Sequence, residues 1–310
     1  ETYQSFQPRL SIRYLLARNF SAKLSYSKMN QYIHLLSNSY ISQPTDIWVP
    51  VTRNIRPMNA HQYTAGLYYT LNRLYNFSIE GYYKRMNNLI EYKDRFPVGI
   101  DYSNWEERVG EGYGRAYGME LMAQKKTGRL SGWIGYTLSW SDRLFPDGSV
   151  NKGRRFPSKY DNRHKVDVVA TYKLSRKVEL TAAWMFASGN YITIKDQVYH
   201  GGTGQTNNGY LHGSGIISGG DGYDYASSSR NNYQLSPYHR LDLGLNFYRY
   251  KKKGRMGIWN LSLCNAYCHP NPFSVETKYD TDSVTGKREI YLEQSILFLF
   301  LPSVSYTYKF

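Results

Sequence analysis

The chain has 310 residues, a formal net charge of +15 and a hydrophobic share of 41 %, with a mean hydropathy of −0.60. No stretch approaches the roughly 20 consecutive apolar residues that a membrane-spanning helix requires, which excludes a helical membrane protein. The 32 tyrosines are more than a soluble core needs, whereas they suit the aromatic girdles, polar interior and outer loops of a membrane β-barrel.

Apolar and polar residues alternate with period two in many segments, most clearly at Leu241, Leu243, Leu245 and Phe247. A helix would need spacings of three and four, so the alternation predicts strands with one face toward an apolar medium. Eleven strands are predicted in chain order, at 9–17, 20–36, 62–71, 76–92, 113–124, 129–141, 162–174, 177–194, 238–250, 255–279 and 288–310.

Tight connections near positions 18, 73, 127, 175 and 253 alternate with long ones at 42–58, 95–112, 142–160 and 195–236. This order is typical of an antiparallel transmembrane β-barrel, in which short turns face the periplasm and long loops face outside. A soluble β-sandwich also alternates, but its strands are usually about 5 to 6 residues long, and the segments 77–92 and 254–279 read as much longer. Single-chain bacterial barrels have an even strand number, so eleven strands predict that further strands precede residue 1.

The positive charge concentrates in the tight turns. No nucleic-acid recognition motif accompanies it, so we expect no nucleic-acid partner. A basic rim facing anionic lipid head groups is a sufficient cause, and we expect outer-membrane lipid and lipopolysaccharide as partners. The residues concerned are Arg18, Arg73, Lys125, Lys126, Arg129, Arg176, Lys177, Lys251, Lys252 and Lys253.

No pattern of a nucleophile, metal ligand or nucleotide loop is present, so we expect neither an enzyme nor a cofactor. His200, His212 and His239 could converge over the barrel mouth, but their spacing does not support a metal site, and none is predicted. Strand parity places five acidic residues on the interior face, where pairing with lumenal Lys and Arg or with a plug surface is favoured over substrate contact: Glu80, Glu120, Asp167, Glu179 and Asp242.

Several segments, among them GMELMAQKKTGRLSGWIGYTLSWS, KYDNRHKVDV and the ending FLPSVSYTYKF, resemble TonB-dependent outer-membrane receptors of the Bacteroidota type over nearly the whole chain. The resemblance implies a plugged barrel of roughly 22 strands, of which residues 1–310 would be the second half, as one partial barrel domain without plug or TonB box. It also implies a C-terminal signal for insertion into the bacterial outer membrane, carried by Val304, Tyr306, Tyr308 and Phe310.

The resemblance further implies active, gated nutrient uptake, with TonB pulling the plug and the remainder of the receptor completing the barrel. A surface lipoprotein is a further possible partner. The loop 195–236 is rich in Gly, Ser, Asn and Tyr, which suits a recognition surface as well as a merely solvated loop. The predicted substrate contacts are Tyr40, Trp48, Trp105, Tyr199, His200, Tyr210, His212, Tyr223 and Tyr225. Two alternatives stay open, a passive porin-like channel and a scaffolding subunit of a multi-chain complex.

Overall fold

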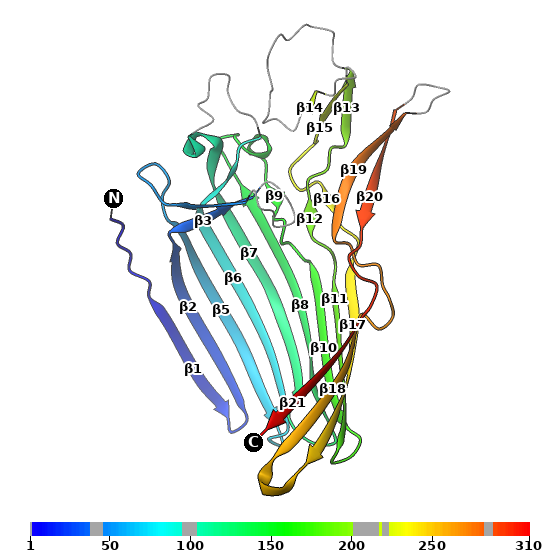
Figure 1. Cartoon of the computed structure of the whole chain (residues 1–310). Helices are drawn as coiled ribbons and strands as arrows, with labels where there is room; N and C mark the ends of the chain where they lie inside the picture. The colour runs from blue at the N-terminus through cyan, green and yellow to red at the C-terminus, as the bar shows by residue number, and fades with distance from the viewer. Residues whose placement is uncertain (1, 38–45, 95–103, 201–216, 219–222, 282–287) are drawn as a thin grey trace.

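Eleven long strands form one antiparallel sheet in chain order (Figure 1). The computed structural model describes residues 2–37, 46–94, 104–200, 217–218, 223–281 and 288–310. The strands of the sheet are β1 (Arg9–Ala17), β2 (Phe20–Gln31), β5 (Met58–Leu71), β6 (Tyr75–Tyr92), β7 (Val109–Lys125), β8 (Leu130–Leu144), β10 (His164–Lys173), β11 (Val178–Ala187), β17 (Tyr238–Tyr250), β18 (Met256–Cys264) and β21 (Leu301–Lys309).

The two ends of the sheet differ as the sequence predicts. Five tight turns join β1 to β2, β5 to β6, β7 to β8, β10 to β11 and β17 to β18 at the lower end, and the longer connections gather at the upper end (Figure 1). The basic residues of the predicted rim lie in these turns or beside them, and therefore together at the lower end. In the described part of the chain, no helix has the length and apolar character to cross a membrane.

The alternation of the sequence becomes an apolar face of the sheet. Residues directly opposite each other in neighbouring strands share a face, and the register sets Leu67, Ile79 and Leu121 side by side on β5, β6 and β7. These side chains are between 37 and 42 % exposed although they are apolar. The same face carries Leu180, Leu245, Leu261 and Val304 on β11, β17, β18 and β21.

The sheet is open, with β1 and β21 as its two edge strands. Every residue of β1 and of β21 is exposed, including Ile12 at 71 % and Val304 at 64 %. Both edges therefore carry unpaired backbone groups, which in a complete barrel bond to a neighbouring strand.

Two predicted strands are wrong at their upper ends. The strand predicted at 20–36 stops at Gln31, because β3 (Ile33–Leu36) leaves the sheet to pair with β4 (Ile47–Pro50). The strand predicted at 177–194 stops at Ala187, and Gly189 then takes a φ of +95°, which ends the extended run. A short ladder follows between β12 (Tyr191–Ile192) and β16 (Tyr233–Gln234).

The last two predicted strands are also wrong, since each is divided in the structure. The segment predicted at 255–279 breaks after Cys264, where Asn265 and Cys268 adopt φ values of +55° and +58°. The Asn265 side chain closes this turn by donating to the carbonyl oxygen of His269. The segment predicted at 288–310 becomes β20 (Arg288–Ser295), which pairs with β19 (Ser274–Thr281) in a separate hairpin, and β21. The segment 254–279 therefore gives no support to the argument from strand length, whereas β6 does.

The buried core lies at the upper end, in two clusters under the long connections. One contains Leu36, Val49, Ile55, Ile90, Tyr92 and Val109, and the other contains Leu89, Phe145, Val150 and Phe156. The remaining elements are also short: η1 (Trp105–Arg108), η2 (Asn151–Gly153), β9 (Phe156–Pro157), β13 (Gln197–His200), β14 (Ile217–Ser218), β15 (Tyr223–Ala226) and η3 (Lys252–Gly254).

Candidate functional site

The five acidic residues predicted for the interior lie on the sheet face opposite the apolar rows. Glu80 on β6 stands directly opposite Glu120 on β7, while the apolar row Ile79–Leu121 lies on the other face. Two carboxylates at adjoining positions repel each other. Within the described residues neither forms an ion pair, so these two residues concentrate negative charge on this face.

The other three acidic residues have partners in the sheet. Asp167 pairs with Lys165 at 3.2 Å, and Asp242 pairs with Arg240 at 2.9 Å. Glu179 accepts hydrogen bonds from the Asn246 amide and from the Tyr248 hydroxyl. The pairing role favoured from the sequence stays a prediction for the set as a whole.

At the upper end, a network of charged and polar groups joins three connections that are distant in sequence. Arg230 forms ion pairs with Glu91 at 3.7 Å and with Asp94 at 3.4 Å, and donates to the Tyr92 carbonyl oxygen at 2.7 Å. Its own backbone N–H donates to the side-chain oxygen of Asn151 at 2.9 Å. Arg230 thereby fixes the end of the loop 195–236 against the ends of β6 and of the β8–β10 connection.

Sequence reasoning missed this network. Glu91 also pairs with Arg143 on β8, so one carboxylate joins two arginines. The reason for the omission is a β-bulge at Asn88, whose φ of +56° shifts the register between Asn87 and Leu89. The shift moves Glu91 onto the face that parity assigns to even-numbered residues such as Glu80.

The residues predicted to contact substrate are dispersed. Tyr199 and His200 lie on β13, and Tyr223 and Tyr225 lie on its partner β15, so that one pair of antiparallel strands carries four of them. Trp48 on β4 is 64 % exposed at the upper end. Trp105 instead packs against the buried cluster that contains Leu36 and Tyr92. The remaining three, Tyr40, Tyr210 and His212, lie outside the described residues.

The predicted insertion signal lies on β21. Val304, Tyr306 and Tyr308 alternate along the apolar face, opposite Leu261, Trp259 and Gly257 of β18. The rings of Tyr306 and Trp259 are 4.8 Å apart, and Phe310 is fully exposed at the end.

One aromatic and histidine cluster was not predicted. His239 stacks on His269 with ring centroids 3.6 Å apart, and its Nδ1 is 2.8 Å from the Tyr267 hydroxyl, which also accepts from the Trp184 indole N–H. The cluster fixes the turn after β18 against β11 and β17. The part of the chain that the structure describes contains no group of three or more His, Cys, Asp or Glu side chains arranged to hold a metal ion.

Buried His34 makes the β3–β4 hairpin sensitive to pH. This residue is 4 % exposed, and burial lowers the pKa of His34 below the ordinary value of 6.5. A base whose pKa is lowered on folding stabilises the folded state fully above pH 6.5, and this stabilisation is lost as the pH falls through the folded value.

We therefore expect the amides of Ile33–Leu36 to exchange with solvent faster below about pH 6, as measured by hydrogen–deuterium exchange after correction for the intrinsic rate. A His34→Gln variant should lose this pH dependence. If the wild type and the variant show the same profile, His34 is not the titrating group.

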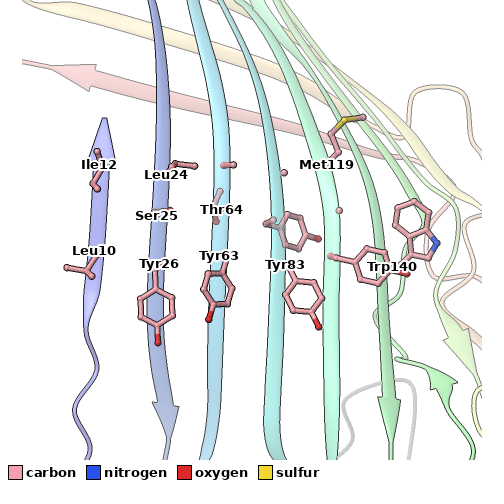
Figure 2. A pocket seen from close by; sticks show the side chains of 15 residues that line it. Leu10, Ile12, Leu24, Ser25, Tyr26, Tyr63, Thr64, Tyr83, Met119 and Trp140 are labelled. Atoms are coloured by element: carbon pink, nitrogen blue, oxygen red, sulfur yellow. The ribbon is translucent and has the colours of Figure 1, made fainter. Parts of the chain in front are cut away.

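A broad hollow lies on the apolar face of the sheet over β1, β2, β5, β6, β7 and β8, and it has a volume of about 800 Å³ (Figure 2). Its floor is low because Ala65 and Gly81 lie opposite each other there. Tyr26, Tyr63, Tyr83 and Trp140 lie side by side along one border (Figure 2). The sequence predicts the apolar face, but the hollow depends on which small residues the register brings together.

An open antiparallel sheet with long strands, one exposed apolar face, and tight turns opposite long connections is a segment of a large β-barrel. The chain belongs to the family of TonB-dependent receptor-like β-barrels, whose model matches residues 1–267. The family is one of receptor-like barrels, in agreement with the expectation that the chain is not an enzyme.

Solved structures of such receptors share the fold. The ferric yersiniabactin uptake receptor FyuA of Yersinia pestis superposes with a TM-score of 0.55 at 13 % identity, over 98 % of this chain and 37 % of its own. The ferric-catecholate import receptor Fiu of E. coli K12 superposes with a TM-score of 0.53 at 12 % identity, over 97 % of this chain and 34 % of its own. The ferripyoverdine receptor of Pseudomonas aeruginosa superposes with a TM-score of 0.54 at 12 % identity, over 92 % of this chain and 31 % of its own.

The chain thus spans about a third of the length of these receptors. A search of curated proteins by sequence gave no match.

Proposed function

We propose that this chain is the C-terminal part of the barrel of an active transporter that takes up a nutrient across the bacterial outer membrane with energy from TonB. The observation that carries the proposal is the eleven-stranded antiparallel sheet with its exposed apolar face, in a chain that matches the receptor-barrel family over residues 1–267. An apolar band on the outside of closed strands is what a bilayer requires.

The rest of the receptor supplies the missing parts in this proposal. The free edges of β1 and β21 are complementary to further barrel strands, and the related receptors are about three times as long as this chain. A plug domain in the interior would face Glu80 and Glu120, which lack ion-pair partners among the described residues. TonB would act through that plug and not through residues 1–310.

Substrate would enter at the upper end, where the paired strands β13 and β15 and Trp48 lie. The Arg230 network holds the described end of the loop 195–236 against β6, so in this proposal that end is in place before substrate arrives. Tyr and Trp rings can stack on sugars, peptide side chains or a tetrapyrrole, so these residue types do not select one substrate class. A surface lipoprotein would contact the same end.

The test is uptake by cells that express the intact receptor in a strain lacking it. The probes are a maltodextrin mixture as the sole carbon source, a peptide hydrolysate as the sole nitrogen source, and haem or ferric citrate as the sole iron source. We expect one probe to require the receptor, and its uptake to fall at least about tenfold when a protonophore is added or TonB is deleted.

Uptake that survives the protonophore would favour the porin-like channel instead. A receptor that transports none of the probes but retains a partner chain in detergent would favour the scaffolding subunit.

A variant ties the test to this chain. Arg230→Gln removes two ion pairs at the loop base, so we expect a rise of several-fold in the apparent KM at an unchanged amount of receptor. Arg18→Gln, which makes the same change in the β1–β2 turn, is the matched control and should leave KM unchanged. Equal KM values in both variants would remove Arg230 from the proposed substrate-binding region.

A further inference from the structure

We propose that the apolar face over β2, β5, β6 and β7 holds a specific phosphorylated lipid of the outer leaflet, with an acyl chain in the hollow and the phosphate above it. The inference rests on the proposed function, because it needs this face to meet lipid. It adds a binding site to a surface that would otherwise contact the bilayer uniformly.

The register creates three successive rows across the same four strands. The first contains Leu24, Ala65, Gly81 and Met119, and it forms the low floor of the hollow. The second contains Tyr26, Tyr63, Tyr83 and Tyr117, and the third contains Lys28, His61, Arg85 and Arg115. Apolar, aromatic and basic groups follow one another in the order of acyl chain, interface and head group in a lipid.

The height of the rows agrees with a bilayer. Arg73 lies in the turn between β5 and β6, and Tyr83 and Arg85 follow it by ten and twelve residues on β6. At about 3.3 Å per residue and a strand tilt of about 40°, these spans correspond to about 25 and 30 Å. Tyr83 then lies at the upper boundary of the apolar band, and Arg85 lies among the head groups.

Lys28, Arg85 and Arg115 give the third row an excess of positive charge. Arg115 pairs with Asp142 at 2.8 Å, and Asp142 also pairs with Arg155, so one carboxylate serves two arginines. Among the residues that the structure describes, no carboxylate pairs with Lys28 or Arg85, and the Arg85 side chain is exposed. A phosphate group would neutralise this excess through charge-assisted hydrogen bonds.

The hollow has space for an added group. A Cβ placed on Gly81 would meet no atom closer than the Gly118 carbonyl oxygen, at 3.9 Å. Tyr117 stacks on Trp140 with ring centroids 5.3 Å apart, and Tyr26 lies 5.1 Å from Tyr63, so the aromatic border is made of rings that support each other. A chain of methylene groups can therefore lie on Ala65 and Gly81 beneath a fixed border.

The experiment measures lipid binding to the intact, delipidated receptor in detergent by native mass spectrometry. The two probes are monophosphorylated lipid A and the same lipid with its phosphate removed. We expect the phosphorylated lipid to bind about 30-fold more tightly. The double variant Lys28→Gln with Arg85→Gln should abolish this preference, whereas Arg176→Gln with Lys177→Gln at the lower turns should preserve it.

A second variant tests the acyl-chain part independently of charge. Gly81→Leu fills the floor of the hollow, so we expect it to weaken the binding of both lipids at least about fivefold. Ala182→Leu, on the same face at β11 and outside the hollow, is the control and should bind both lipids as the wild type does.

Equal binding of the two lipids by the wild type, or an unchanged preference in the Lys28 and Arg85 double variant, would overturn the proposal. Displacement of the lipid by inorganic phosphate alone would also overturn it, because the site would then hold a free anion. The uptake assay separates the two proposals, since a receptor without a lipid site still transports its probe, and a receptor that fails to transport can still discriminate between the lipids.

Discussion

Replacing Gly132 by Ala is expected to reduce the amount of folded receptor in the membrane fraction to less than a tenth of the wild-type level. Gly132 on β8 has a φ of +156°, and a Cβ there would lie 2.1 Å from the Val169 carbonyl oxygen of β10. The backbone at Gly132 and at Val169 is fixed by the β8–β10 ladder, so neither segment can move away without loss of the register. The measurement is the share of heat-modifiable, folded receptor on an unheated gel.

The matched control is Gly81→Ala, which adds the same methyl group to a strand of the same sheet where 3.9 Å of space is open. Its folded share should equal that of the wild type. If Gly132→Ala also assembles normally, β8 and β10 do not approach as closely as the structure has them.

Replacing Phe145 by Ala is expected to destabilise the upper end locally by about 3–5 kcal/mol. Phe145 is fully buried, stacks on Phe156 with ring centroids 6.1 Å apart, and packs with Leu89 and Val150. Its ring also covers Gly112 of β7, where a Cβ would lie 2.6 Å from it. Truncation leaves a cavity that these neighbours, held by the sheet, cannot fill.

The check is hydrogen–deuterium exchange of the amides in 109–114 and 145–157, which should open far more often than in the wild type. Phe6→Ala is the control, because Phe6 is 81 % exposed and its truncation removes little packing. An unchanged exchange rate in Phe145→Ala would mean that the cluster does not hold the β8–β10 connection.

The strands of the sheet could be predicted well from the sequence because their pattern has a simple physical origin. A strand that faces one apolar and one polar medium alternates regardless of its partner, and the tight turns fix which strands are neighbours. Each of the eleven predicted segments contains one strand of the sheet, and the predicted order of these strands is confirmed. The ends of the strands do not, because above the sheet the chain no longer meets two media. The breaks at Gly189, Asn265 and Cys268 depend on single backbone angles that alternation does not encode.

The candidate site was less predictable for a related reason. Parity separated Glu80, Glu120, Asp167, Glu179 and Asp242 from the apolar rows, since it needs only local sequence. The ion pair between Arg143 and Glu91 joins residues 52 positions apart, and the hydrogen bond from Arg230 to the Tyr92 carbonyl oxygen spans 138. In both contacts, the residues around one partner in the sequence do not indicate which residue the other partner is. The substrate-contact residues remain a prediction.

The bulge at Asn88 reverses, within β6, which face of the sheet the odd-numbered residues occupy. Below it, odd-numbered residues such as Ile79 lie on the apolar face, and above it the odd-numbered Leu89 and Glu91 lie on the opposite face. One inserted residue thus separates the wall of the barrel from its upper rim. Substitutions above the bulge are therefore constrained by the packing of a small buried core. Substitutions below it are constrained only by the alternation of apolar and polar residues on the two faces of the sheet.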